Sequence, residues 1–229
     1  IYYSGKQGQT RAGVGIVVRR DATASFLPVS ERLCMCSVEM NKPKRKLTMI
    51  CAYAPTLPRS NANPALREDF YGELESLVNT VSKGNTLILA GDFNAKTGSG
   101  YDEFQNNMGK YGKGKLNGNE RELLEFACRN DLILTKTMFY HKLSHITTWE
   151  GPIRQHTYKD GSIRRNPFRN QIDYFLTRRK DQSLVTDARS YSGTTVYTDH
   201  RLVRMTMIAK TYREKRQFTR KIDFIRMKD

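Results

Sequence analysis

The chain centres on the segment Thr86-Leu87-Ile88-Leu89-Ala90-Gly91-Asp92-Phe93-Asn94-Ala95. Its first half is a short, unbroken apolar run, which predicts a strand buried on both faces. The run ends at a glycine followed by two short polar residues, Asp92 and Asn94. Side chains at i and i+2 of an extended segment point to the same side. The segment therefore predicts a carboxylate and a carboxamide side by side at the mouth of a buried strand.

Two interpretations of Asp92 and Asn94 compete. The pair suits a site that orients a water molecule and holds a phosphate oxygen beside a hard metal ion. Asp and Asn are also common where a strand runs into a turn, because their side chains bond to the neighbouring backbone. The rest of the chain has to decide between them.

Size and charge narrow the class of protein. A chain of 229 residues with 38% hydrophobic residues predicts one ordinary domain with a sizeable core, which we assign to residues 1–209. The formal net charge of +16 favours polyanionic partners, nucleic acid before acidic small molecules. Residues 210–229 are dense in Lys and Arg and are expected to form a basic linker or tail. The alternative is a merely soluble basic protein, or a basic flank on a neutral domain.

The apolar runs and the cysteines indicate the cellular compartment of the protein. No apolar run approaches the length of a membrane span, and no secretory signal pattern is present, so we expect no membrane partner. The four cysteines lack the spacing of a zinc site and predict free, buried thiols. Reduced thiols fit an intracellular protein of the nucleus or cytoplasm.

Hydrophobic periodicity predicts a layered mixture of strands and helices. A helix is expected to start at Asn63-Pro64, bury Leu66 and Phe70 at helical spacing and stop at Gly84. A second helix is expected to open at Asn119, and residues 96–118 form a long loop with little periodicity. Strands are expected at 12–18, 31–38, 46–53, 86–90, 132–135, around 149, 171–176 and 201–209.

Polar residues interrupt three of these strands, with Asp92 at the first, Asp173 at the second and Asp199-His200 at the third. Asp173 lies between apolar neighbours, where burying a carboxylate is costly without a partner. A histidine is the natural partner, since a carboxylate bonded to one ring nitrogen fixes the tautomer. The alternatives are a surface pair of Asp173 with Arg169 or Arg178, and an ordinary turn role for Asp199.

These motifs, in order, resemble the endonuclease/exonuclease/phosphatase superfamily, and more narrowly the apurinic-type endonuclease domain of RTE-like non-LTR retrotransposons. The resemblance covers nearly all of residues 1–210, and it is the ordered set that is specific. The motifs are Tyr53-Ala54-Pro55, Gly91-Asp92-Phe93-Asn94, Asn119-Glu120-Arg121, the Trp149 strand, Gln171-Ile172-Asp173-Tyr174, Asp187-Ala188-Arg189-Ser190-Tyr191 and Thr198-Asp199-His200.

The resemblance implies an α/β fold, a four-layer α/β/β/α sandwich of two packed sheets flanked by helices. It implies phosphodiester hydrolysis assisted by Mg²⁺ (or Mn²⁺). Asp92 would orient or deprotonate the attacking water, and Asn94 would hold that water or a phosphate oxygen. His200, held by Asp173, would donate to the scissile phosphate. Asp199 would lie at or near the metal, and Tyr53 would support the phosphate side.

DNA is the partner that the resemblance implies, and basic residues of two loops would follow its backbone. They are Lys113, Lys115, Arg164, Arg165 and Arg169. A downstream reverse transcriptase domain would be fused in the full-length protein, and target DNA would be nicked to prime reverse transcription.

One departure from the family pattern concerns the start of the chain. Family members begin with a strand carrying an Asn, followed by a strand that ends in a Glu, the main metal ligand. Both would precede Ile1, so we expect an N-terminally truncated domain with weak or no activity as given. The alternatives are a domesticated, non-catalytic domain that binds DNA or protein, and a phosphatase acting on lipid or small phosphates.

Overall fold

The computed structural model describes residues 1–5, 12–40, 45–56, 65–98, 100–113, 118–157, 163–193 and 197–208. The predicted helix start at 63–64, Lys115 and the predicted tail at 210–229 lie outside the described residues.

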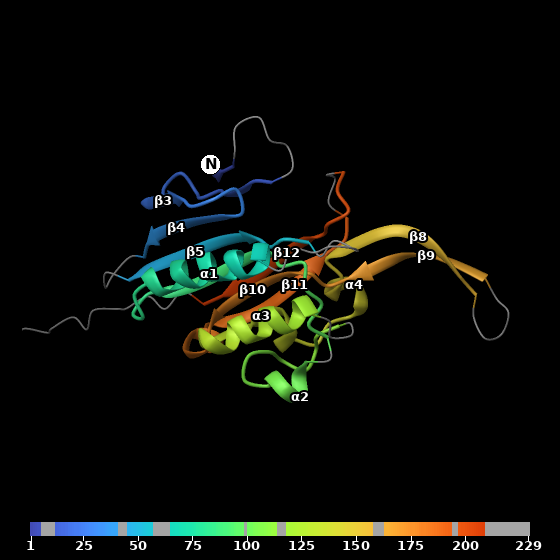
Figure 1. The fold of residues 1–229 in the computed structure, drawn as a ribbon. Helices are drawn as coiled ribbons and strands as arrows, with labels where there is room; N and C mark the ends of the chain where they lie inside the picture. The colour runs from blue at the N-terminus through green and yellow to red at the C-terminus, as the bar shows by residue number, and fades with distance from the viewer. Residues whose placement is uncertain are drawn as a thin grey trace, which may run out of the picture.

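A six-stranded sheet forms the centre of the molecule, in the order β3-β4-β5-β6-β10-β7 (Figure 1). Only β5 and β6 pair in parallel within it, and the other neighbours are antiparallel. The strands are β3 (Ala24–Pro28), β4 (Leu33–Glu39), β5 (Lys46–Tyr53), β6 (Thr86–Asp92), β10 (Asp173–Arg178) and β7 (Leu132–Leu134). The predicted central strand is therefore β6, and Leu87, Ile88 and Leu89 are buried in it as expected.

In the part of the chain that the structure describes, three further pairs of strands flank this sheet: β1–β2, β8–β9 and β11–β12. Their bounds are β1 (Tyr2–Ser4), β2 (Val14–Ile16), β8 (Trp149–Thr157), β9 (Ile163–Asn170), β11 (Val185–Tyr191) and β12 (Leu202–Met207). The β8–β9 hairpin extends away from the main sheet (Figure 1). The predicted α/β fold with flanking sheets and helices is confirmed, and among the described residues two separate strand pairs, β1–β2 and β11–β12, stand where one continuous second sheet was expected.

Two long helices, α1 (Ala65–Thr80) and α3 (Gly118–Arg129), cover one face of the sheet (Figure 1). Their apolar side chains share one core with the inward residues of β5, β6, β7 and β10, because helical and strand periodicities present apolar rows to each other. Phe70 is buried as predicted, whereas Leu66 is 59% exposed and lies off the buried face of α1. The second helix begins one residue before Asn119.

The described parts of the stretch 96–118 contain more regular structure than the expected loop. It contains the short helix α2 (Tyr101–Phe104), and Phe104 and Met108 are buried in the core. The Asn107 side chain donates to the carbonyl oxygens of Ala127 (3.2 Å) and Leu132 (2.8 Å), which ties this stretch to α3 and β7. One helical turn is too short to produce a periodic sequence signal, and this is why it was not predicted.

Candidate active site

A row of three side chains crosses the sheet at the end of β6. Asp92 is the register partner of Tyr53 on β5 and of Asp173 on β10. Directly opposite residues of neighbouring strands share a face, so all three lie on the same side of the sheet. The Tyr53 ring lies under the Arg32 guanidinium, 5.1 Å from the ring centroid. Its predicted support of a phosphate stays a prediction.

Gly91 allows β6 to approach β5 immediately before Asp92. Its φ is +153°, and a Cβ built there would lie 1.8 Å from the carbonyl oxygen of Ala52. No residue with a side chain fits this position without moving one of the two strands. Glycine at this position therefore permits the close approach of β5 and β6 next to Asp92.

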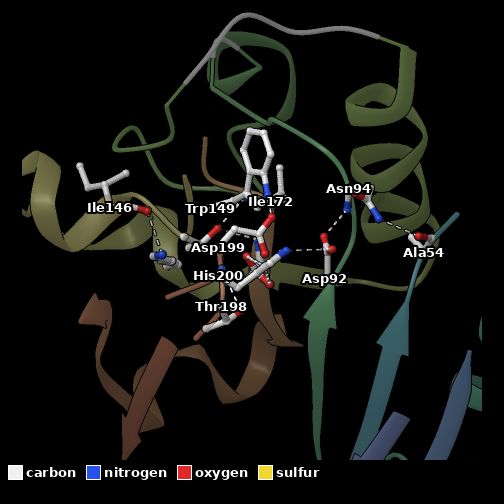
Figure 2. A network of polar contacts seen from close by, with 12 residues as sticks. Ala54, Asp92, Asn94, Ile146, Trp149, Ile172, Thr198, Asp199 and His200 are labelled. Atoms are coloured by element: carbon white, nitrogen blue, oxygen red, sulfur yellow. Dashed lines mark hydrogen bonds and ion pairs between the residues drawn. The ribbon is translucent and has the colours of Figure 1, made fainter. Parts of the chain in front are cut away.

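The Asn94 side chain does not lie parallel to the Asp92 carboxylate as predicted, although the Asn94 backbone contacts it. The strand ends at Asp92, and Asn94 takes a left-handed conformation with φ of +49°. Its backbone N–H donates to Asp92 Oδ1 (2.8 Å), and its side-chain Nδ2 donates to the Ala54 carbonyl oxygen (2.8 Å). Figure 2 shows the Asn94 amide turned toward Ala54. The alternation rule fails because the extended backbone ends at Asp92, and the predicted role of Asn94 in holding a water or a phosphate oxygen stays a prediction.

The predicted histidine partner of Asp173 is His200. Its Nδ1 lies 3.1 Å and 3.2 Å from the two carboxylate oxygens of Asp173. The surface alternatives are not realised, since Arg169 pairs with Glu150 (3.0 Å) and Arg178 donates to carbonyl oxygens just beyond the end of α1. From the sequence, Asp173 was the acid whose burial most needed a partner, and in the structure that partner is His200.

His200 also approaches Asp92, with Nε2 4.0 Å from Asp92 Oδ2 (Figure 2). The hydrogen bond with Asp173 is the main cause that raises the pKa of His200, and burial opposes it. Burial, followed by the charge of Asp173, raises the pKa of Asp92 to about 7, while the Asn94 N–H lowers it. Two carboxylates and a histidine that favours its protonated form thus meet at one point.

Asp199 is held by the indole of Trp149, whose Nε1 donates to Asp199 Oδ2 (2.8 Å, Figure 2). The Trp149 ring packs closely on Gly151, where an added Cβ would lie 2.3 Å from a ring carbon. Asp199 is not part of the cluster in which ligand atoms of Asp92, Asp173 and His200 all lie within 4.8 Å of one another. Its predicted place at the metal stays a prediction.

Two buried residues that the sequence did not single out support the cluster. Thr148 Oγ1 accepts the backbone N–H groups of Ile172 (2.9 Å) and Asp173 (3.1 Å). Lys136, only 2% exposed, donates from Nζ to the carbonyl oxygen of Ile146 (2.9 Å), and burial lowers its pKa to about 7. The sequence signal for Thr148 was its place beside Trp149. No sequence signal marked Lys136, because a single lysine in a polar stretch predicts a solvated side chain.

Basic and aromatic side chains gather at the hairpin beside the cluster. Arg165 and Arg169 are exposed on β9, and the charge of Arg169 contributes to the lowered pKa of Lys113, after burial. The Lys96 ammonium lies 5.4 Å from the centre of the Phe168 ring. The structure thus brings three of the five predicted DNA contacts to this region. Lys115 and the side chain of Arg164 lie outside the described residues.

A cleft of about 440 Å³ opens beside His200 at the base of the hairpin. Its lining includes Glu150, Ile153, Pro167, Asp199 and His200. The Arg201 guanidinium pairs with Glu150 at this base, which fixes the end of the hairpin next to the cluster. A bound molecule in the cleft would reach both the histidine and the hairpin surface.

The cluster has the chemistry of a site for a divalent cation. Hard cations such as Mg²⁺ prefer carboxylate oxygens, and Asp92 and Asp173 supply them from neighbouring strands. Their mutual repulsion contributes to the raised pKa of Asp92, and a cation would relieve it. The residues therefore fit a metal ion.

Comparisons with known proteins identify the family of the chain. The chain belongs to the endonuclease/exonuclease/phosphatase family, whose model matches residues 1–200. It is 32% identical over 204 residues to craniofacial development protein 2 of Bos taurus, a match that covers 89% of this chain and 32% of the relative. The chain thus spans about a third of the length of the curated relatives it matches.

Solved structures share the fold. The endonuclease domain of TRAS1, a telomere-specific non-LTR retrotransposon, superposes with a TM-score of 0.61 at 13% identity, covering 92% of this chain and 80% of that one. A 3′ phosphatase from Neisseria, solved with a product DNA hairpin, superposes with a TM-score of 0.54 at 13% identity. The match covers 84% of this chain and 72% of the phosphatase chain. Among the described residues, no helix has the length and apolar character needed to cross a bilayer.

Proposed function

We propose that this chain is a Mg²⁺- or Mn²⁺-dependent endonuclease domain that hydrolyses phosphodiester bonds of DNA. The observation that carries the proposal is His200, held by Asp173 and directed at Asp92 at the end of a buried strand. This arrangement pairs a hydrogen-bond donor for a phosphate oxygen with a carboxylate for an attacking water. The family membership supports hydrolysis of phosphate esters.

The residues divide the work as follows. Asp92 orients the attacking water and accepts its proton. His200 donates to a non-bridging oxygen of the phosphate, and Asp173 keeps its ring in place and favours its charged form. Carboxylates of the cluster, with Asp199 close by, would hold the cation, which neutralises charge on the phosphate when bound. The Tyr53 hydroxyl would contact the phosphate from β5.

DNA is the proposed substrate because the hairpin surface beside the cluster is basic and aromatic. Exposed Arg165 and Arg169, with Lys113, suit the phosphate backbone, and Phe168 and Trp149 offer apolar faces. The net charge of +16 supports the same partner over a small phosphate ester. In a longer protein, a fused downstream reverse transcriptase domain would use the nicked DNA end as its primer, and the protein would act in the nucleus or cytoplasm.

The test is nicking of supercoiled plasmid by this chain, and by a longer protein that contains it, with Mg²⁺ or EDTA. His200→Ala and Asp92→Asn should each lower nicking by about 10²–10⁴-fold. The matched control is Asp102→Asn, which changes an exposed carboxylate away from the cluster. Nicking that survives in His200→Ala, or that EDTA leaves unchanged, would refute the proposal.

A second candidate is a non-catalytic domain that binds DNA, favoured by the same hairpin surface. It predicts no metal-dependent nicking by either protein, together with DNA affinity that falls steeply with salt. Arg165→Ala should weaken that affinity, while His200→Ala should leave it unchanged.

A further inference from the structure

Three cysteines lie on one face of the main sheet, on the side that β2 covers. Cys34 and Cys36 on β4 are fully buried, and Cys51 on β5 is half-buried. They pack with Val14 and Ile16 of β2 in a small apolar cluster. Tyr53 of the active-site row packs against the edge of this cluster, while Asp92, Asp173 and His200 are not part of it.

Cys34 and Cys51 are register partners on neighbouring antiparallel strands. Directly opposite residues in such a ladder have Cα atoms about 4.5–5.5 Å apart. Disulfides join residues with Cα separations of about 4.4–6.8 Å, so the backbone spacing suits a bridge. The two side chains share a face and lie in the same small cluster.

We propose that Cys34 and Cys51 form a redox-active dithiol whose sulfurs join in an intramolecular disulfide when the protein meets a peroxide. Cys36 cannot replace either partner directly, because the residue opposite it is Met49. The inference is independent of the proposed nuclease function.

The two sulfurs are not equivalent. Interactions with the Cys34 thiol and with the backbone N–H groups of Gly15 and Ala52 lower the pKa of Cys51, although burial opposes them. The interaction with Cys51, followed by burial, raises the pKa of Cys34. Cys51 is also the more exposed of the two. It is therefore the attacking thiolate, and Cys34 is the resolving thiol.

The reaction proceeds in two steps. The Cys51 thiolate attacks one peroxide oxygen, the O–O bond breaks, and the departing hydroxide takes a proton to become water. Cys51 is left as a sulfenic acid. The Cys34 sulfur then loses its proton and attacks the Cys51 sulfur, so that an S–S bond forms and the S–O bond breaks, releasing a second water. Two thiols and one peroxide give one disulfide and two waters.

The test uses the chain with Cys128→Ser, which removes the one exposed cysteine and keeps a donor for Asn107 Oδ1. Hydrogen peroxide should lower the titratable thiols from three to one, and a thiol reductant should restore them. Trypsin separates Cys34 from Cys51 at Lys46, so the bridge appears as a cross-linked peptide pair two hydrogens lighter.

Control variants decide which thiols react. Cys36→Ser, added to Cys128→Ser, should leave the cross-link intact and lower the remaining thiols to zero. Cys51→Ala should abolish the cross-link and leave Cys34 reduced. A cross-link that contains Cys36, thiols that all survive the peroxide, or oxidation to sulfinic acid with no cross-link would each overturn the proposal. Because the first measurement needs no change at Cys34 or Cys51, it stands even if those variants fold poorly.

Discussion

Thr148 is expected to be a main support of the candidate active site, and Thr148→Val tests this with almost no change in shape. The side chain is fully buried, and its hydroxyl oxygen is the acceptor for the backbone N–H groups of Ile172 and Asp173. Valine keeps the branched side chain and removes this acceptor. Both N–H groups lie at the start of β10, next to the carboxylate that holds His200.

The magnitude follows from the two lost hydrogen bonds. A buried N–H group left without its acceptor costs about 1–3 kcal/mol. Two such groups share one oxygen here, so we expect Thr148→Val to lower the free energy of unfolding by about 2–4 kcal/mol. This is a large part of the about 5–15 kcal/mol that stabilises an ordinary domain.

Urea unfolding measures this change, followed by far-ultraviolet circular dichroism and by fluorescence of the single tryptophan, Trp149. The matched control is Thr147→Val at the neighbouring buried position. Its hydroxyl donates to the Leu143 carbonyl oxygen (3.0 Å), and that oxygen keeps the N–H of Thr147 (3.1 Å). Thr147→Val leaves no buried polar group without a partner, so it should lower the free energy of unfolding by only about 1 kcal/mol. Equal losses in the two variants would refute the reasoning.

Three other substitutions test the packing around the cluster by the same unfolding measurement. Gly91→Ala would place a Cβ against the Ala52 carbonyl oxygen at a φ of +153°, so it should cost about 2–6 kcal/mol; a loss under 1 kcal/mol would contradict the close approach of β5 and β6. Tyr174→Phe removes the hydroxyl that donates to the Gln171 carbonyl oxygen (2.8 Å), and a loss of about 1–3 kcal/mol is expected. Burial raises the pKa of Glu120 from 4.5 to about 7, so its carboxyl contributes stability below pH 4.5 that is lost as the pH rises through 7. Glu120→Gln should therefore exceed the wild type by about 1–3 kcal/mol at pH 8 and show no such advantage at pH 4, and the reverse order would show that the charged form is favoured.

Local patterns were enough to place most of the strands and both long helices. The β5 bounds and the start of β6 match the predicted residues, because runs of apolar and β-branched residues specify extended structure locally. The short helix α2 was missed, and β11 was quoted only as a family motif. The first is a single turn, and the second alternates polar and apolar residues without a strong turn signal on either side.

The sequence by itself determined the identity of the acids and the histidine and the order of their motifs, because residue type and local spacing are properties of the chain. Only the tertiary structure decided which of them meet. Register across three strands brings Tyr53, Asp92 and Asp173 into one row, and the approach to β12 delivers His200 to it. The tertiary structure also directs the Asn94 side chain toward Ala54, and it places Asp199 where it accepts a hydrogen bond from Trp149. Contacts between residues far apart in the chain depend on register and packing, which no local pattern encodes.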